Sequence, residues 1–378
     1  MAQAYVADYH LPKTLRPGPL PGLTVKVFHI ARDREEPILF RYLRFPIDTL
    51  LHGISYAVLN CLIHSPTPLD EERTWNFITQ PEPLLRRKLR EMYPPSFVRQ
   101  IVLLGKQYQD ARLGISAHYD VSNEFYKLFL DPKFMFYSCA DHTTGHETLE
   151  EAQTNKANHL LGLIDPKPGE KILELGCGWA SMLRYVEQHT GDRENLWGYT
   201  LSKEQAAYIQ ENFGYNVLLK NFVTDDYPPE FYDKVYSIAA WEAIRPQEID
   251  VIMPKVYAAL KPGGRFVLHF FARLQDRLQM SNSIAQLFFP GHVPASYQMH
   301  VRGFERAGFR ITHTSCHDYR LTLRQWFENM VAHREEALKI VGVKTYNRYV
   351  VFFPASYKYF DDRMGVLFRF VLRKPPIT

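Results

Sequence analysis

The chain has 378 residues, of which 46% are hydrophobic and 23% charged, and this balance indicates a globular protein with a sizeable core. It excludes disorder as the main state, and a net charge of +4 gives no support to nucleic-acid binding. The positive excess lies wholly in residues 1–116, with 15 Lys and Arg against 11 Asp and Glu. A mildly basic extension suits an anionic membrane surface, and a solvated surface explains it equally well.

Residues 1–115 are expected to form a mainly helical extension. Apolar residues at helical spacing over 47–62 predict a helix that either packs on its own domain or lies on lipid. A cationic helix over 82–92 and another over 97–108 follow, so residues 45–108 are a candidate for peripheral membrane contact. No stretch predicts a spanning helix or a signal peptide, and the four cysteines have neither disulfide nor zinc spacing. We therefore expect a cytoplasmic protein without a metal site.

From about residue 165, short apolar runs alternate with helical stretches. Strands are predicted at 171–175, 195–199, 217–219, 234–238 and 265–271, and helices include 203–212 and 251–260. This alternation predicts an α/β fold with a parallel sheet that is covered on both faces.

A Gly-x-Gly loop follows the first of these strands. Glu174, Gly176 and Gly178 stand where the strand should meet a helix, and the glycines let the backbone turn tightly beside a ligand. A dinucleotide site would need another glycine and an acidic residue about 20 positions later. The next strand instead ends in Tyr199-Thr200-Leu201-Ser202, which disfavours NAD. An acidic residue and Gly-x-Gly after an apolar strand are typical of S-adenosylmethionine-dependent methyltransferases.

Six sequence blocks carry a more specific resemblance. They are His118-Tyr-Asp-Val-Ser-Asn123, Tyr137-Ser-Cys-Ala140, Thr148-Leu-Glu-Glu-Ala-Gln153, Glu174–Trp179, Gly198-Tyr-Thr-Leu-Ser-Lys-Glu-Gln205 and Phe288-Phe-Pro-Gly291 with Pro294 and Ser296. With these blocks in order, residues 116–372 resemble the cyclopropane-fatty-acid synthase family, which includes the mycolic acid cyclopropane synthases and the plant coclaurine-type N-methyltransferases.

The resemblance implies a Rossmann-like class I methyltransferase core over 116–378, with a mostly parallel seven-stranded sheet. Helices inserted at about 272–300 would cap the substrate pocket. It also implies a set of S-adenosylmethionine-binding residues, which comprises Tyr137, Ser138, Glu174, Gly176, Gly178, Thr200, Leu201, Gln205, Phe222 and Ile238.

The family's cyclopropane synthases hold a bicarbonate ion as general base, and its ligands map onto this chain as well. They correspond to Cys139, Glu242, His269, the backbone of Phe271, and Tyr349. The chemistry agrees with such a site, because a sulfonium methyl group attacked by an alkene leaves a carbocation that must lose a proton before a ring closes. Water must be excluded, aromatic faces can stabilise the cation, and a base must lie close to it.

Three departures indicate a divergent member. Ala180 stands where the family usually has glycine, and Asn221–Thr224 replaces an acidic run near the adenine. Ala243 follows Glu242 where the family has histidine, which argues against the N-methyltransferase branch and leaves ring closure less certain than methyl transfer.

We therefore expect methylene or methyl transfer to the double bond of an unsaturated lipid acyl chain, with bicarbonate deprotonating the carbocation. A small-molecule C- or N-methyltransferase acting on an apolar substrate is the first alternative. A non-catalytic lipid- or cofactor-binding protein is the second. A homodimer is left open.

Overall fold

The computed structural model describes residues 54–81, 121–274, 287–289 and 295–376. Its centre is one seven-stranded sheet in the order β3-β2-β1-β4-β5-β7-β6, parallel except for β7, which runs antiparallel to both of its neighbours. The strands are β1 (Ile172–Leu175), β2 (Leu196–Thr200), β3 (Asn216–Leu219), β4 (Tyr232–Ile238), β5 (Leu260–Arg273), β6 (Arg310–His317) and β7 (Gly365–Arg373). The expected sheet of the class I methyltransferases is confirmed.

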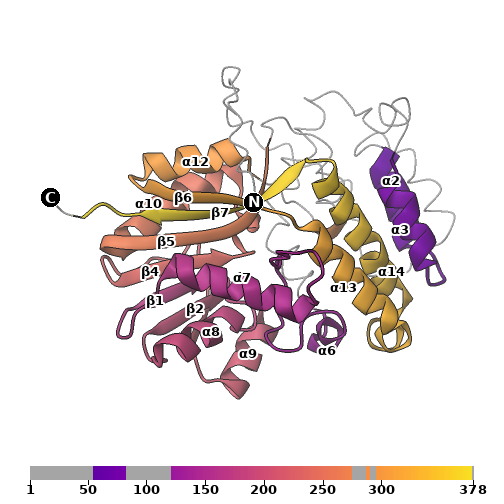
Figure 1. Ribbon diagram of the computed structural model, residues 1–378, viewed down its shortest axis with the longest axis horizontal. Coiled ribbons are helices and arrows are strands. Elements are labelled where there is room, and N and C mark those ends of the chain that lie inside the picture. The colour runs from indigo at the N-terminus through magenta and orange to yellow at the C-terminus, as the bar shows by residue number, and fades with distance from the viewer. Residues whose placement is uncertain (1–53, 82–120, 275–286, 290–294, 377–378) are drawn as a thin grey trace, which may run out of the picture.

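Helices cover both faces of the sheet and one of its ends (Figure 1). They are α2 (Ile54–Ile63), α3 (Glu71–Thr79), α6 (Asn123–Lys127), α7 (Leu149–Ile164), α8 (Ser181–Thr190), α9 (Lys203–Asn212), the 3-10 turn η2 (Trp241–Ala243), α10 (Pro246–Ala259), α12 (Tyr297–Arg306), α13 (Arg320–Ala332) and α14 (Arg334–Asp361). Helices α10 and α12 pack on one face, and α7 and α8 pack on the other. Helices α13, α14, α3 and α2 stand together beside the end of the sheet.

The core strands form where apolar runs can be buried on both faces. All four residues of β1 are buried, as a parallel strand between two helical layers requires. All five predicted strands occur, whereas β6 and β7 had not been identified. Strand β6 alternates between exposed and half-buried residues and is rich in polar side chains, so its apolar signal is weak. The antiparallel strand β7 is mostly buried, but Arg369 interrupts its run of apolar residues and so weakens the strand signal.

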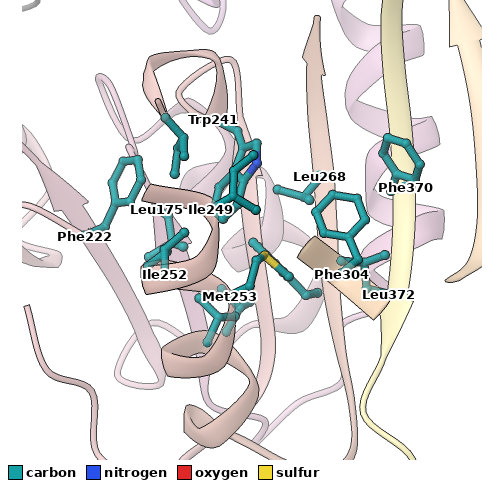
Figure 2. Packing of buried hydrophobic residues seen from close by; sticks show 14 of the residues in the cluster. Leu175, Phe222, Trp241, Ile249, Ile252, Met253, Leu268, Phe304, Phe370 and Leu372 are labelled. Atoms are coloured by element: carbon teal, nitrogen blue, oxygen red, sulfur yellow. The ribbon is translucent and has the colours of Figure 1, made fainter. Parts of the chain in front are cut away.

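Helix α9 has the predicted bounds, whereas α10 begins five residues before the predicted start. Its first residue is Pro246, whose fixed φ suits the first helical turn, and the Glu248 carboxylate accepts the amide of Arg245 over 3.0 Å and pairs with its guanidinium group. Figure 2 shows α10 side chains meeting β5 and α12 residues in the core. Gly303 lets α12 come close to α10, because a Cβ at this position would lie only 2.2 Å from Cγ2 of Ile249 on α10.

Residues 54–62 of the helix predicted over 47–62 lie in α2, whose apolar stripe packs against α14, and residues 47–53 lie outside the described residues. Leu59 and Ile63 share a buried cluster with Val351 and Ala355, so this face is covered by protein. The helices predicted over 82–92 and 97–108, the motif at 118–120, and 275–286 and 290–294 of the cap lie outside the described residues. Within the described part of the chain, no helix is long and apolar enough to cross a bilayer.

Candidate active site

A pocket opens at the carboxyl ends of β1, β2 and β4, where the strand order reverses around β1. Ligands of open α/β sheets bind at such a switch point. All ten residues expected to bind S-adenosylmethionine line this pocket. They are Tyr137, Ser138, Glu174, Gly176, Gly178, Thr200, Leu201, Gln205, Phe222 and Ile238. The geometry therefore brings this set together, and the role of each residue stays a prediction.

The two glycines of the loop have different surroundings: Gly176 is packed tightly against the protein, whereas Gly178 faces open space. Gly176 has a φ of +80°, and an added Cβ would lie 2.2 Å from Cβ of Ala240. Gly178 has a φ of +54° and lines the pocket, and a Cβ there would meet no atom within 4 Å. Ala180, the departure from the family's glycine, also has a left-handed φ of +61°. These features fit a ligand that approaches the backbone at Gly178.

Two polar pairs stand beside the loop. Tyr236 donates a hydrogen bond of 3.1 Å to Glu174, and burial raises the pKa of this carboxyl group to about 8. The hydroxyl group of Thr200 donates to Oε1 of Gln205 over 2.9 Å. The polar groups of this end of the pocket are thus positioned by neighbouring side chains.

Lys156 is a polar neighbour of the pocket that the sequence analysis missed. Its ammonium group donates a 2.7 Å bond to Oγ of Ser138 and lies 3.4 Å from the ring centre of Phe136. Burial lowers its pKa to about 7. The available signal was a lysine on the buried face of α7, three residues after Gln153.

Glu242 lies in η2, directly after β4 ends. Ala239, between β4 and η2, has a left-handed φ of +54°, and Oε1 of Glu242 accepts the amide of Phe271 on β5 at 3.2 Å. Its other oxygen, Oε2, is buried without a hydrogen-bond partner. Burial raises the pKa of Glu242 to about 8. The pocket therefore contains a carboxyl group that can hold or take a proton near neutral pH.

His269 is fully buried on β5, two residues before Phe271 and on the same face of the strand. Nε of Arg369 donates to its Nδ1 over 2.9 Å, and its Nε2 has no partner. Burial, together with the charge of Arg369, holds the pKa of His269 well below its usual range. An imidazole that accepts a hydrogen bond at Nδ1 is also not doubly protonated. One buried donor and one buried acceptor without partners, on His269 and Glu242, fit the demands of a small protonated oxyanion such as bicarbonate.

Cys139 and Tyr349 already have partners. The Cys139 thiol lies 3.4 Å from the carbonyl oxygens of Ala140 and Asp318, and burial raises its pKa well above the usual value. The Tyr349 hydroxyl lies 3.0 Å from that of Tyr126, and burial raises its pKa to about 12. Of the five expected bicarbonate ligands, Glu242 and Phe271 line the pocket, whereas Cys139, His269 and Tyr349 are buried and are not among its lining residues.

The pocket continues from Glu242 into an aromatic end. Its walls come from β5, α13, α14 and the segment before α12, and they comprise Phe271, Phe289, Tyr319, Trp326, Phe352, Tyr359 and Phe360. Ala243 also lines the pocket and adds a methyl group where the family has an imidazole. This end has the apolar character that a hydrocarbon chain requires.

A second polar cluster lies behind His269. Asp141, His159 and His317 present atoms within 4.8 Å of one another, which would suit a cation. Arg369 already fills that role, because it donates to both oxygens of Asp141 over 2.6 and 2.7 Å and lies 2.6 Å from Nδ1 of His159. The sequence analysis missed Asp141 and Arg369, although an arginine inside an apolar strand requires a buried partner.

Comparisons with known proteins cover the same region. The family model described as Mycolic acid cyclopropane synthetase matches residues 106–370. Cyclopropane mycolic acid synthase MmaA2 of Mycobacterium tuberculosis is 32% identical over 276 residues, which are 67% of this chain and 93% of that protein. Its solved structure aligns with a TM-score of 0.64 at 30% identity and covers 70% of this chain and 98% of its own.

A further solved structure, that of mycolic acid cyclopropane synthase CmaA1 with SAH and CTAB, aligns with a TM-score of 0.62 at 28% identity. It covers 70% of this chain and 98% of its own. The family match runs from residue 106 to within β7 and therefore includes every element that lines the pocket.

Proposed function

The chain belongs to the mycolic acid cyclopropane synthase family of S-adenosylmethionine-dependent methyltransferases, and on that premise we propose that it transfers a methylene or methyl group to the double bond of an unsaturated lipid acyl chain. The observation that carries the proposal is one continuous pocket with a polar end at the glycine loop and an aromatic end beyond Glu242. A relative solved with SAH and CTAB, a detergent with an alkyl chain, supports an apolar substrate.

S-Adenosylmethionine, when bound, supplies an electrophilic methyl group. The residues that would hold it are those around the glycine loop, where Gly178 leaves its backbone open and Glu174 and Gln205 offer polar groups. Ser138, bonded to the buried Lys156, stands on the same side. We propose that this end fixes the methyl donor so that the methyl group points toward the aromatic end.

The aromatic end would exclude water and face the positive charge that develops on the acyl chain. Phe271, Trp326 and Phe360 contribute ring faces and edges to this wall. Ring faces attract a cation, and the lack of water prevents its capture by hydroxide or solvent. These two properties are what methyl transfer to an isolated alkene requires of the protein.

Deprotonation of that cation is proposed to use a bound bicarbonate, which would supply the base. His269 would donate from Nε2, and Glu242 would relay the proton through Oε2, since both atoms are buried without partners. Cys139 and Tyr349, which already bond to other protein groups, would support the wall of this site from within the core. The identity of the base stays a proposal, and so does peripheral membrane contact through residues 45–108.

The test uses the full chain, S-adenosylmethionine labelled on its methyl group, and vesicles of phospholipid with monounsaturated chains. Matched vesicles with saturated chains are the control. We expect label in the organic phase, on an acyl chain that has gained one carbon, and only with the unsaturated lipid. Removal of bicarbonate from the buffer should lower the rate, and its return should restore it.

Other outcomes select the alternatives. Label that reaches only the aqueous phase when a cell extract is supplied would favour a small-molecule methyltransferase. Cofactor binding without transfer to any acceptor would favour a binding protein. Lipid labelling that is insensitive to bicarbonate would retain methyl transfer and reject the proposed base.

A further inference from the structure

Arg369 is a fully buried arginine that links His269 to an acidic partner. Strands β5 and β7 pair in antiparallel register, and His269 stands directly opposite Arg369. Directly opposed side chains share a face of the sheet, which explains the 2.9 Å bond from Nε of Arg369 to Nδ1 of His269. Both terminal nitrogens of the guanidinium group bond to the carboxylate of Asp141.

The direction of the bond to His269 decides where the imidazole carries its hydrogen. A guanidinium group has only donors, so Nδ1 of His269 must be the acceptor and carries no hydrogen. With no hydrogen on Nδ1, the ring carries its single hydrogen on Nε2, the atom that is buried without a partner. Many functional histidines donate Nδ1–H to a carboxylate or carbonyl group, and here the polarity is reversed.

The surroundings of Arg369 are built to keep it charged and fixed. An isolated buried cation would be strongly unfavourable, and a bidentate carboxylate is the partner that offsets this cost best. Asp141 supplies that partner from the loop before α7, and Nδ1 of His159 on α7 lies 2.6 Å from the guanidinium group. Arg369 thus has little freedom to move away from His269.

We infer that Arg369 is a positioning residue that holds His269 in the Nε2–H tautomer, so that His269 acts in the active site as a fixed hydrogen-bond donor to an anion and not as a base. The catalytic consequence of this inference rests on the proposed function, whereas the tautomer itself does not. Asp141 serves the same purpose one step further away, because it fixes the guanidinium group.

The first arm of the test measures the tautomer by NMR in the full chain labelled with ¹⁵N-histidine. Signals of His269 are assigned by their loss in the variant His269→Gln, among the 15 histidines of the chain. We expect a protonated Nε2 and an unprotonated Nδ1 in the wild type. The paired variant Arg369→Met with Asp141→Asn, which leaves no buried charge without a partner, should shift the proton to Nδ1 or mix the two tautomers.

The second arm measures lipid methylation. The paired variant should lower turnover by about 10- to 100-fold, as the loss of a supporting contact to a ligand histidine does, with unchanged affinity for S-adenosylhomocysteine. Arg369→Lys keeps a donor and the charge, so it should recover part of the turnover and guards against a folding failure of the paired variant. In the His269→Gln background, Arg369→Lys should cost little more, because residues that act through one another are not additive.

Arg265→Met with Asp165→Asn is the matched control. It removes a different arginine–aspartate pair, that of Arg265 on β5, the strand of His269, and neither residue lines the pocket. It should change neither the tautomer nor turnover. Hydrogen on Nδ1 in the wild type, or additive effects of His269 and Arg369 changes, would overturn the inference. If the wild type shows the Nε2–H tautomer but methylates no lipid, the proposed function fails and the structural assignment of Arg369 stands.

Discussion

The cofactor end of the pocket, around the glycine loop, is built mainly from short loops after β1 to β4, with Tyr137 and Ser138 added from the segment before α7. The base end, around Glu242 and His269, collects residues from more distant parts of the chain. Glu174, Gly176 and Gly178 lie within five positions of one another. His269 and Arg369 are 100 positions apart and meet only because β5 and β7 pair in one register. A local backbone shape thus serves the cofactor end, and tertiary packing of buried polar groups serves the base end.

The largest expected effect is the loss of turnover in Glu242→Gln, a change that should affect the base end and leave the cofactor end intact. The change keeps the size of the side chain and its contact to the amide of Phe271 but removes the acid–base function of the carboxyl group. Loss of a general acid–base group typically lowers turnover by about 10²- to 10⁴-fold. Calorimetry with S-adenosylhomocysteine should show unchanged affinity. Equal losses of affinity and turnover would mean that the two ends are not separable.

The converse change, Gly178→Ala, should act on the cofactor end alone. The new methyl group would enter the pocket where the backbone is open, at a φ of +54° that an L-residue adopts at a cost of about 1 kcal/mol. We expect this methyl group to lower cofactor affinity by about tenfold or more, which corresponds to a loss of about 1.4 kcal/mol of binding free energy. Isothermal calorimetry measures the change.

Gly214→Ala is the matched control for that variant. Gly214 has a φ of +69°, meets no atom within 4 Å of an added Cβ, and lies in solvent after α9. Both variants should lose a similar free energy of unfolding, and only Gly178→Ala should lose cofactor affinity. A similar loss of affinity in both would assign the effect to backbone strain.

The same contrast explains what the sequence could and could not predict. The strands, the glycine loop and the pocket-lining cofactor residues follow from apolar runs and contiguous motifs, which local physics governs. Strand β6 was not predicted, because its exposed residues alternate with half-buried ones and its apolar signal is weak. Helix α10 begins before its predicted start, at Pro246, where Arg245 and Glu248 interact across its first turn. Arg369 and Asp141 could not be paired from the sequence, because the β5–β7 register decides which side chains meet.

The pH dependence of stability offers the finest test, because it probes one buried carboxyl group of the base end. Burial raises the pKa of Glu242 from 4.5 to about 8, so between these values the folded protein holds a proton that the unfolded chain has released. Its contribution to the free energy of unfolding therefore falls as pH rises through this window, by at most about 1.4 kcal/mol per unit. Glu242→Gln removes this penalty.

The melting temperature of Glu242→Gln should therefore exceed that of the wild type by an amount that grows from pH 5 to pH 8 and then levels off. The difference between the two proteins cancels the titration of other groups, including Glu174. The same change at Glu305, a solvent-exposed carboxyl group on α12, is the matched control and should give a difference that does not vary with pH. A constant difference for Glu242→Gln as well would mean that this carboxyl group is ionised throughout the range. The proposed proton relay through Glu242 would then be wrong, and another group with a pKa near neutrality would have to accept the proton.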